Sequence, residues 1–256
     1  MAVAILGRRG MAVRGARQRP QKPPFRLGLL RGFELSRGGV AIPLSNGLQH
    51  LLAYLAVNDH SLRRVHVAGI LWADVSDERA AGNLRSTLWR LRLAGLDLVG
   101  VDRDYLSLLP TVVVDVREAN RLAKFVLDPT ADVTALGLED LLEAGELLPG
   151  WYDDWVVLER ERQRQVCLHL LEGLCKRWTK AGRYEKAIMA GLEAVAGEPL
   201  RESAHRALIS AYLAEGNPGE AVRQYRRYCT ILHDELRLEP SAQITALLSG
   251  LPATHG

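Results

Sequence analysis

The segment 77–93 places polar and basic side chains at helical spacing. On a helix that turns by about 100° per residue, four of them share one face: Arg79, Asn83, Ser86 and Arg90. Arginine and asparagine can each form paired hydrogen bonds with the edge of a DNA base, and serine can bond to several base edges. The chemistry that this face predicts is therefore direct contact with base edges in a DNA groove.

A second set of residues is suited to the phosphates beside such a groove. Two arginines lie on one flank of the same helix, two begin the predicted helix before it, and two residues lie at the tip of a predicted hairpin after it. Cations hold phosphates whatever the base sequence, and a helix N-terminus adds a favourable dipole. The predicted phosphate contacts are Arg63, Arg64, Arg85, Arg92, Arg103 and Tyr105.

The alternative for the segment 77–93 is a charged face that meets only solvent, as most arginine-rich helix surfaces do. Its place inside a predicted winged unit favours contact with DNA over a face that meets only solvent. Trp89 projects on the same side as the polar residues, where a large exposed apolar ring is unusual. Three contacts are possible for this ring: with a DNA sugar, with the second half of the chain, or with a partner protein.

A small sheet is predicted upstream of these residues. Apolar and polar residues alternate over 25–36, and a Gly38-Gly39 turn leads into the apolar stretch 40–42. Alternation with period two, interrupted by glycine, is typical of short antiparallel strands.

Three helices and a hairpin follow this sheet. Ser45 is predicted to cap the first helix, which runs to about residue 57, and the other two are predicted over 64–71 and 77–93. Two stretches rich in Leu and Val then flank residues 102–104, as in a β-hairpin. The third helix is expected to face the core with Ala81, Leu84, Leu88 and Leu91. Residues 25–114 are therefore predicted to form a winged helix-turn-helix domain.

A period of 34 residues runs through the second half of the chain. It relates Trp178 to Tyr212, Gly182 to Gly216, Ala187 to Ala221 and Ala194 to Tyr228. This period is typical of stacked helical hairpins of the tetratricopeptide (TPR) kind. We predict an all-α, TPR-like domain over 115–256, packed against the winged domain because no long linker separates them. The predicted fold class is mainly α with a small β component.

Charge is distributed unevenly along the chain. Residues 1–24 carry six basic residues and no acidic one, and are predicted to be a disordered basic tail. Residues 25–114 contain ten basic against eight acidic residues, whereas 115–256 contain 17 against 22. The basic and acidic ends are expected to have different partners. No apolar run is long enough to span a membrane, so we expect a cytoplasmic protein without a membrane partner.

Nothing in the sequence predicts an enzyme, a metal site or a cofactor. No phosphate-binding loop of the Gly-x-x-x-x-Gly-Lys kind is present, and the seven histidines lack metal-ligand spacing. Cys167, Cys175 and Cys229 are widely spaced and are expected to be core thiols. The pair Asp153 and Asp154 precedes a predicted helix and is expected to cap it. We predict no catalytic residue.

Longer stretches resemble known regulators. The segment 79–92, with Leu71-Trp72 before it and the strand 105–108 after it, resembles the DNA-binding domain of OmpR-type regulators. The second half carries four motifs that resemble the bacterial transcriptional activator domain: LPGWYDDWV (148–156), EPLRE (198–202), AVRQY (221–225) and DELRLEPS (234–241). Over about residues 25–250 the chain is thus similar to the Streptomyces antibiotic regulatory protein (SARP) family.

The resemblance implies a transcription activator that binds tandem direct repeats near the promoter −35 element, commonly for antibiotic biosynthetic genes. Its implied partners are double-stranded promoter DNA, a second copy in a side-by-side homodimer, and RNA polymerase holoenzyme through the sigma factor and the C-terminal domain of the alpha subunit. The implied location is the nucleoid. The chain departs from the family pattern at Trp89, where a small polar residue is usual, and we expect no nucleotide-binding extension of the kind that larger relatives carry.

Two other functions are alternatives to a SARP-type activator. A response regulator of the usual form is not expected, because only a basic tail precedes the winged domain. A helical adaptor whose winged unit does not bind specific DNA is the remaining alternative, since stacked helical hairpins form concave protein-binding surfaces. Affinity for duplex DNA that falls steeply with salt, and is much higher for one sequence, distinguishes the two.

Overall fold

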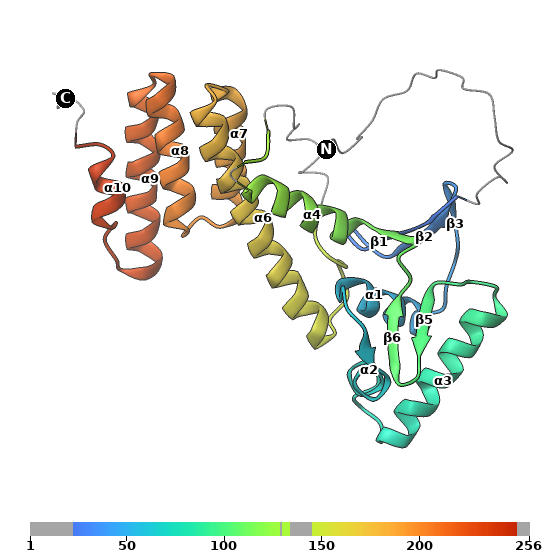
Figure 1. The fold of residues 1–256 in the computed structure, drawn as a ribbon. Coiled ribbons are helices and arrows are strands. Elements are labelled where there is room, and N and C mark those ends of the chain that lie inside the picture. Colours follow the sequence, from blue (N-terminus) through green and yellow to red (C-terminus); the bar gives the residue numbers. More distant parts are fainter. Residues whose placement is uncertain (1–22, 129, 134–144, 250–256) are drawn as a thin grey trace, which may run out of the picture.

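The computed structural model describes residues 23–128, 130–133 and 145–249 of the 256-residue chain. Its helices and strands form a small β-containing winged unit followed by a row of packed helices (Figure 1). The predicted fold class is therefore confirmed. The predicted basic tail, 1–24, lies almost entirely outside the described residues. Among the helices that the structure describes, none is long and apolar enough to cross a membrane.

The predicted sheet is present and gains a strand. β1 (Phe25–Gly28) pairs antiparallel with β2 (Glu34–Arg37), which pairs with β3 (Val40–Ala41). A further strand, β7 (Val112–Val114), lies parallel to β1 on its other side. Sequence periodicity did not predict this pairing, because it joins segments far apart in the chain.

Three helices follow as predicted: α1 (Asn46–Val57), α2 (Arg64–Leu71) and α3 (Asp77–Leu93). Ser45 occupies the N-cap position of α1, but its side chain makes no capping hydrogen bond. Its backbone carbonyl instead accepts from the N–H groups of Leu48 and Gln49, at 2.9 and 3.0 Å. The predicted cap is right in position and wrong in its chemistry.

The buried stripe of α3 differs from the prediction at its edge. The three predicted leucines are buried, but Ala81 is only partly buried, and Ala80 and Thr87 are buried instead. The Thr87 hydroxyl donates to the carbonyl of Asn83 at 2.8 Å, so its polar atom is satisfied inside the core. The buried stripe is therefore rotated toward Thr87, and the exposed face of α3 is rotated with it.

A second sheet forms around the predicted hairpin. β5 (Val99–Asp102) pairs with β6 (Tyr105–Leu108), and the short strand β4 (Leu62–Arg63) pairs with the other side of β6. Arg103 lies in the turn with a left-handed φ of 49°. Because α2 begins directly after β4, this sheet connects the tip of the hairpin to the start of α2.

The rest of the described chain is helical: α4 (Asp115–Leu127), α6 (Asp154–Lys180), α7 (Tyr184–Gly197), α8 (Glu202–Glu215), α9 (Pro218–Leu236) and α10 (Ala242–Ala246). From α6 to α9, each helix packs against the next. Gly182 and Gly216, one period apart, both adopt left-handed φ values of 70° and 91° at helix ends. The repeat thus corresponds to two stacked helical hairpins, as predicted.

The winged unit and the first turn of α6 share one hydrophobic core. Leu148, Trp155 and Val156 belong to the same buried cluster as the first sheet and α1–α3. The ring of Trp155 meets Tyr54 of α1 edge-on, with ring centroids 5.1 Å apart. The two parts of the chain are therefore packed together rather than linked by an independent tether.

Charged side chains satisfy the backbone at this junction. The carboxylate of Asp115 accepts from the N–H groups of Leu29 and Leu30, which follow β1, at 2.8 and 2.9 Å. Arg117 donates to three carbonyl oxygens at the C-terminal end of α1, and Arg160 of α6 donates to three in the segment before that helix. Buried backbone groups left without partners would cost stability. These contacts therefore fix the position of α4 and α6.

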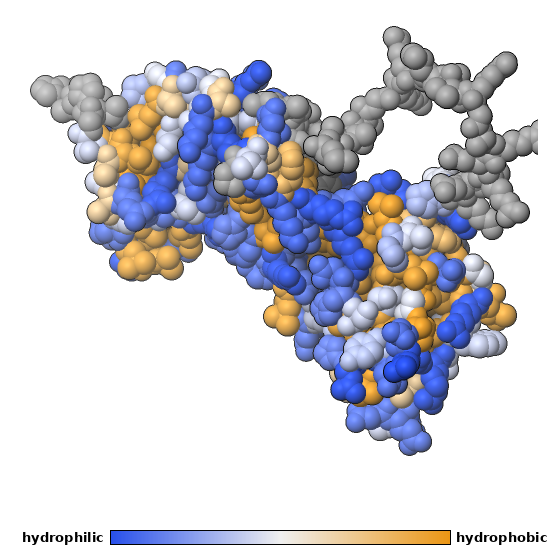
Figure 2. Space-filling model, viewed as in Figure 1, coloured by the Kyte–Doolittle hydropathy of each residue, from blue (hydrophilic) through white to orange (hydrophobic). Residues whose placement is uncertain are grey.

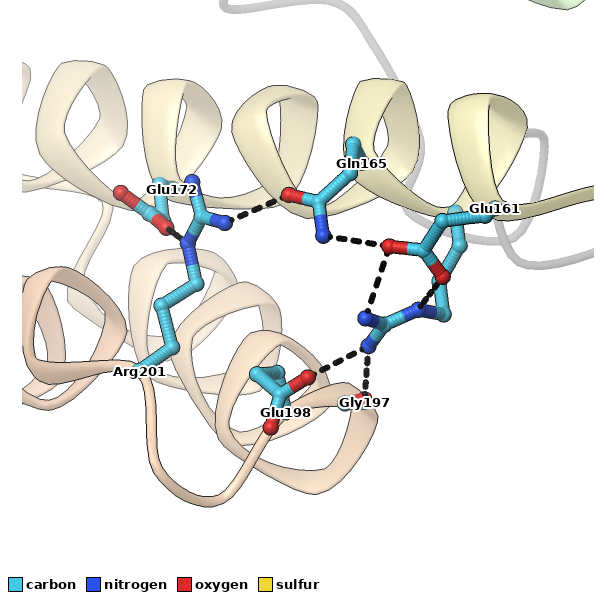
Figure 3. Close-up of polar contacts among 7 residues, drawn as sticks. Glu161, Gln165, Glu172, Gly197, Glu198 and Arg201 are labelled. Carbon is cyan, nitrogen blue, oxygen red and sulfur yellow. Dashed lines mark hydrogen bonds and ion pairs between the residues drawn. The ribbon is translucent and has the colours of Figure 1, made fainter. Parts of the chain in front are cut away.

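Ionic contacts hold α6 against the connection between α7 and α8 (Figure 3). Glu172, which is buried on α6, accepts a hydrogen bond from Arg201. It also accepts one from the hydroxyl of Ser203. Arg164 bridges Glu161 and Glu198, with nitrogen–oxygen distances of 2.9 and 2.7 Å. Hydrogen bonds from Arg164 and Gln165 lower the pKa of Glu161 to about 2. The position of the second hairpin on α6 is thereby set by directional contacts as well as by packing.

A buried histidine, His205, lies between α8 and α9. Its Nε2 donates to the carbonyl of Pro199, its Nδ1 accepts from the Gln224 amide, both at 2.9 Å, and its ring packs on Tyr228. The neutral ring with its proton on Nε2 satisfies both hydrogen bonds. Burial lowers the pKa of His205, so the folded protein favours that neutral form.

The neutral state of His205 predicts a pH dependence of stability. Because its pKa is lower in the folded than in the unfolded state, the unfolded chain binds more protons between the lowered value and about 6.5. The free energy of unfolding should therefore rise with pH up to about 6.5 and decline below it. Denaturant titrations from about pH 5 to 7.5 should show this rise weakened in His205→Gln. An identical pH dependence in both proteins contradicts the prediction.

Candidate nucleic-acid interface

Helix α3 is held by its apolar side and presents its polar side to solvent. The buried stripe packs on α1 and α2. Asp77 and Glu78 lie in the first turn and Arg90 and Arg92 in the last, which matches the helix dipole at both ends. Figure 1 places α3 at the end of the molecule remote from α8, α9 and α10. Hydrophilic residues predominate where α2 leads into α3 (Figure 2).

The residues predicted for base contact are all solvent-exposed: Arg79, Asn83, Ser86 and Arg90. Arg85 and Arg92, predicted for phosphate, are exposed on the other flank of the same helix. None of these four arginines forms an ion pair or side-chain hydrogen bond with another described residue. Their guanidinium groups are therefore available to an external anion.

The other predicted phosphate contacts come together around the hairpin. We name these residues the wing cluster: Arg63, Arg64, Arg103 and Tyr105. The sheet pairs Arg63 with Tyr105, and the backbone N–H of Arg64 donates to the carbonyl of Asp104 at 2.7 Å. All but the half-buried Arg64 are exposed. Asp102 and Asp104 flank Arg103, so the positive charge at the hairpin tip is partly offset.

The arginines of the helical part have a different environment. Arg117, Arg160 and Arg177 each donate to backbone carbonyls, and Arg164 and Arg201 bind carboxylates. Their role is therefore structural. Sequence alone did not separate these arginines from the unpaired ones, because both kinds lie on helices with mixed polar faces.

The structure also shows which residues lie at the centre of the exposed face of α3. At about 100° per residue, the direction opposite the buried stripe falls among Gly82, Trp89 and Leu93. Ser86 is the predicted base-contact residue nearest this centre, and Asn83 lies nearest the edge. Trp89 is 62% exposed and Leu93 71% exposed. Leu93 was missed by the sequence analysis, because an apolar residue at the end of an amphipathic helix is expected to face the core.

Other chemistry-bearing residues form no reactive site in the described structure. No group of three or more metal-ligating side chains occurs within the described ranges. Burial raises the pKa of the Cys175 thiol to about 12, which keeps it protonated at neutral pH. Asp153 is at the N-cap of α6 but makes no capping bond there, and its carboxylate lies 3.4 Å from Nε2 of His50. Asp153 and Asp154 therefore lie at the start of α6 as predicted, but the Asp153 side chain makes no capping hydrogen bond.

A cleft of about 520 Å³ lies between α4, α6 and the segment after α1. The side-chain oxygen of Asn120 is buried there without a hydrogen-bond partner. Acidic and basic residues both line the cleft, and the guanidinium of Arg117 is already bound to backbone carbonyls. The lining favours no one class of ligand.

Comparisons with known proteins agree with this architecture. Residues 138–251 match the family model of the bacterial transcriptional activator domain. The transcriptional regulatory protein EmbR of Mycobacterium tuberculosis, like that of Mycobacterium bovis, is 28% identical over 245 residues, which cover 86% of this chain and 61% of the relative. The chain thus spans about three fifths of the length of these relatives.

A solved structure shares the fold. The structure of Mycobacterium tuberculosis EmbR in complex with a low-affinity phosphopeptide superimposes with a TM-score of 0.66 at 20% identity. The match covers 88% of this chain and 64% of that one. It therefore includes both the winged unit and the helical part. Residues 138–251 are thus identified as a bacterial transcriptional activator domain, and these likenesses support the resemblance to SARP-type transcriptional regulators that was expected from the sequence.

Proposed function

We propose that this regulator binds a specific DNA sequence through α3 and the wing cluster and activates transcription from that site. The observation that carries the proposal is the set of exposed arginines on both flanks of α3, which have no partner within the part of the chain that the structure describes. A helix about as wide as the major groove can approach the bases with Arg79 and Arg90 while Arg85 and Arg92, on its other flank, meet the phosphates. In this arrangement Arg79, Asn83, Ser86 and Arg90 contact base edges.

The wing cluster and the remaining arginines contribute affinity rather than sequence preference. Arg63, Arg64, Arg103 and Tyr105 contact the sugar-phosphate backbone next to the groove that α3 occupies, and Arg85 and Arg92 contact it from α3 itself. The N-terminus of α2 adds its dipole to the charges at its start. In this proposal the DNA-binding domain comprises residues 25–114 and the helical domain residues 115–256.

The helical part is proposed to hold two copies of the protein together on promoter DNA and to contact RNA polymerase. Two copies bind tandem direct repeats near the −35 element as a side-by-side homodimer, and the helical hairpins contact RNA polymerase holoenzyme through the sigma factor and the C-terminal domain of the alpha subunit. The protein then acts in the cytoplasm at the nucleoid and has no enzymatic activity. Antibiotic biosynthetic genes are the proposed targets. Support comes from the match to the transcriptional activator domain and from the family resemblance.

Selection of random duplex DNA by the purified protein tests the proposal directly. Enrichment of one motif, repeated in the same orientation, supports a DNA-binding activator that binds as a tandem pair. Affinity for the selected duplex should fall steeply as salt increases, because bound phosphates release counterions. If no motif is enriched and only weak, salt-sensitive binding is seen, the helical adaptor becomes the better account.

Substitution of single arginines should separate base contact from phosphate contact. Arg90→Ala should cost about 1 to 3 kcal/mol on the selected duplex and relax the preference at one position. Arg63→Ala should weaken the selected and the unrelated duplexes alike and lower the salt dependence. Binding titrations of both variants on both duplexes check this. Equal losses on all sequences from both changes contradict the assigned roles.

Gly82 offers a test in which stability and function change in opposite directions. A Cβ at this position would meet only the Arg85 guanidinium, at 3.7 Å, so the fold leaves room for alanine. Gly82→Ala should stabilise α3 by about 1 kcal/mol. It should nevertheless weaken binding to the selected duplex, because its methyl group prevents close approach of the helix to the bases.

Thermal unfolding and DNA titration of the same preparation check both effects. Gly219→Ala, in the first turn of α9, adds a methyl group to open space and serves as the control. It should leave DNA affinity unchanged. Undiminished DNA affinity in Gly82→Ala would show that this face of α3 does not approach the duplex closely.

A further inference from the structure

We infer that Trp89 is a sequence-determining residue that contacts the 5-methyl group of a thymine in the major groove. The inference deepens the proposed function and rests on it, because it requires α3 to occupy that groove.

The structure removes one of the alternatives for this side chain. Trp89 does not pack on the helical part of the protein: it is 62% exposed, and no ring contact or hydrogen bond joins it to another described residue. The helices packed against α3 are α1 and α2, which lie on its opposite side. An indole held in solvent in this way is available for contact with another molecule.

The surroundings of Trp89 favour an anionic partner. One helical turn away on the same surface lie Arg85 and Arg92, and Arg90 is the next residue. All three are exposed and unpaired with described residues. An apolar protein surface would have to desolvate these guanidinium groups without replacing their hydrogen bonds, which is costly. DNA satisfies them, with Arg85 and Arg92 at phosphates and Arg90 at a base edge, while the indole reaches the bases between.

The position of Trp89 on α3 selects the group that it meets. Trp89 is near the centre of the exposed face, and that centre faces the floor of the groove when the flanking arginines meet the phosphates. The apolar group that base edges offer in the major groove is the methyl group of thymine. Gly82 and Ser86 lie on the same face, nearer the N-terminus of α3. Their small side chains let the N-terminal end of the helix approach the bases more closely, while the indole, farther along the helix, contacts a base toward one end of the bound DNA sequence.

The inference predicts a coupling between one indole and one methyl group. The probe is the duplex selected by the wild-type protein, prepared as a series in which each thymine in turn is replaced by deoxyuridine, which lacks only the methyl group. One replacement should weaken wild-type binding about four-fold, as expected for a single buried methyl. The same replacement should have no effect on Trp89→Ala, because the partner of the methyl group has been removed.

Two further variants define the coupling. Trp89→Phe retains an apolar ring and should keep most of the discrimination between thymine and deoxyuridine. Leu236→Ala removes a 50% exposed apolar side chain at the end of α9, remote from α3, and should bind the whole series as the wild type does. Thermal unfolding of each variant establishes that it is folded before binding is measured.

Three results would overturn the inference. Equal weakening of Trp89→Ala on every duplex of the series would assign the indole to a sugar or to a structural role. Unchanged DNA affinity in Trp89→Ala, with transcription lost, would assign it to a protein partner. A selected site in which no thymine responds to replacement would exclude the methyl contact. Failure of the wild-type protein to select any sequence is a distinct result, which overturns the proposed function first.

Discussion

The burial of Trp155 and Val156 against the winged unit is the constraint on which the arrangement of the molecule depends. These residues begin α6, the helix on which the helical hairpins are built, yet they lie in the core that also holds α3. Neither part can rotate freely without exposing this core to water, and large apolar side chains lose their burial energy when exposed. The orientation of α3 and the orientation of the helical hairpins are therefore fixed by the same packed core.

Polar contacts restrict this packing to one relative orientation of the two parts. Packing alone tolerates small rotations, whereas hydrogen bonds from Arg117 and Arg160 to sets of backbone carbonyls are lost over short displacements. On α3, by contrast, the arginine side chains have no ion-pair or hydrogen-bond partner among the described residues. What distinguishes the two uses of arginine is whether a carbonyl or carboxylate of the folded chain is within reach, and that is decided by tertiary structure.

This distinction explains how much could be predicted from the sequence. The bounds of α2 and α3, the hairpin and the 34-residue repeat follow from local periodicity, glycine and proline, so they were predicted closely. The pairing of β7 with β1 was not, because its partners are far apart in the chain. The side chains of Ser45 and Asp153 were misjudged for a related reason: a capping residue is recognised by its position, but its hydrogen bonds depend on competing neighbours such as His50. The candidate site was predicted as a set of residues, whereas the centre of its exposed face depended on which of Ala80 and Ala81 is buried.

The unbroken course of α6 has a mechanical consequence. With 27 residues it is about 40 Å long, and it carries one core at its first turn and another along its later turns. Its first turn is anchored against α1 of the winged unit, so a rotation of about 5° at that end would displace the far end by about 3 to 4 Å, given this length. Such a displacement is comparable to the reach of a side-chain contact. The stiffness of this single helix thus determines how accurately a partner held by the hairpins is positioned relative to whatever α3 has bound.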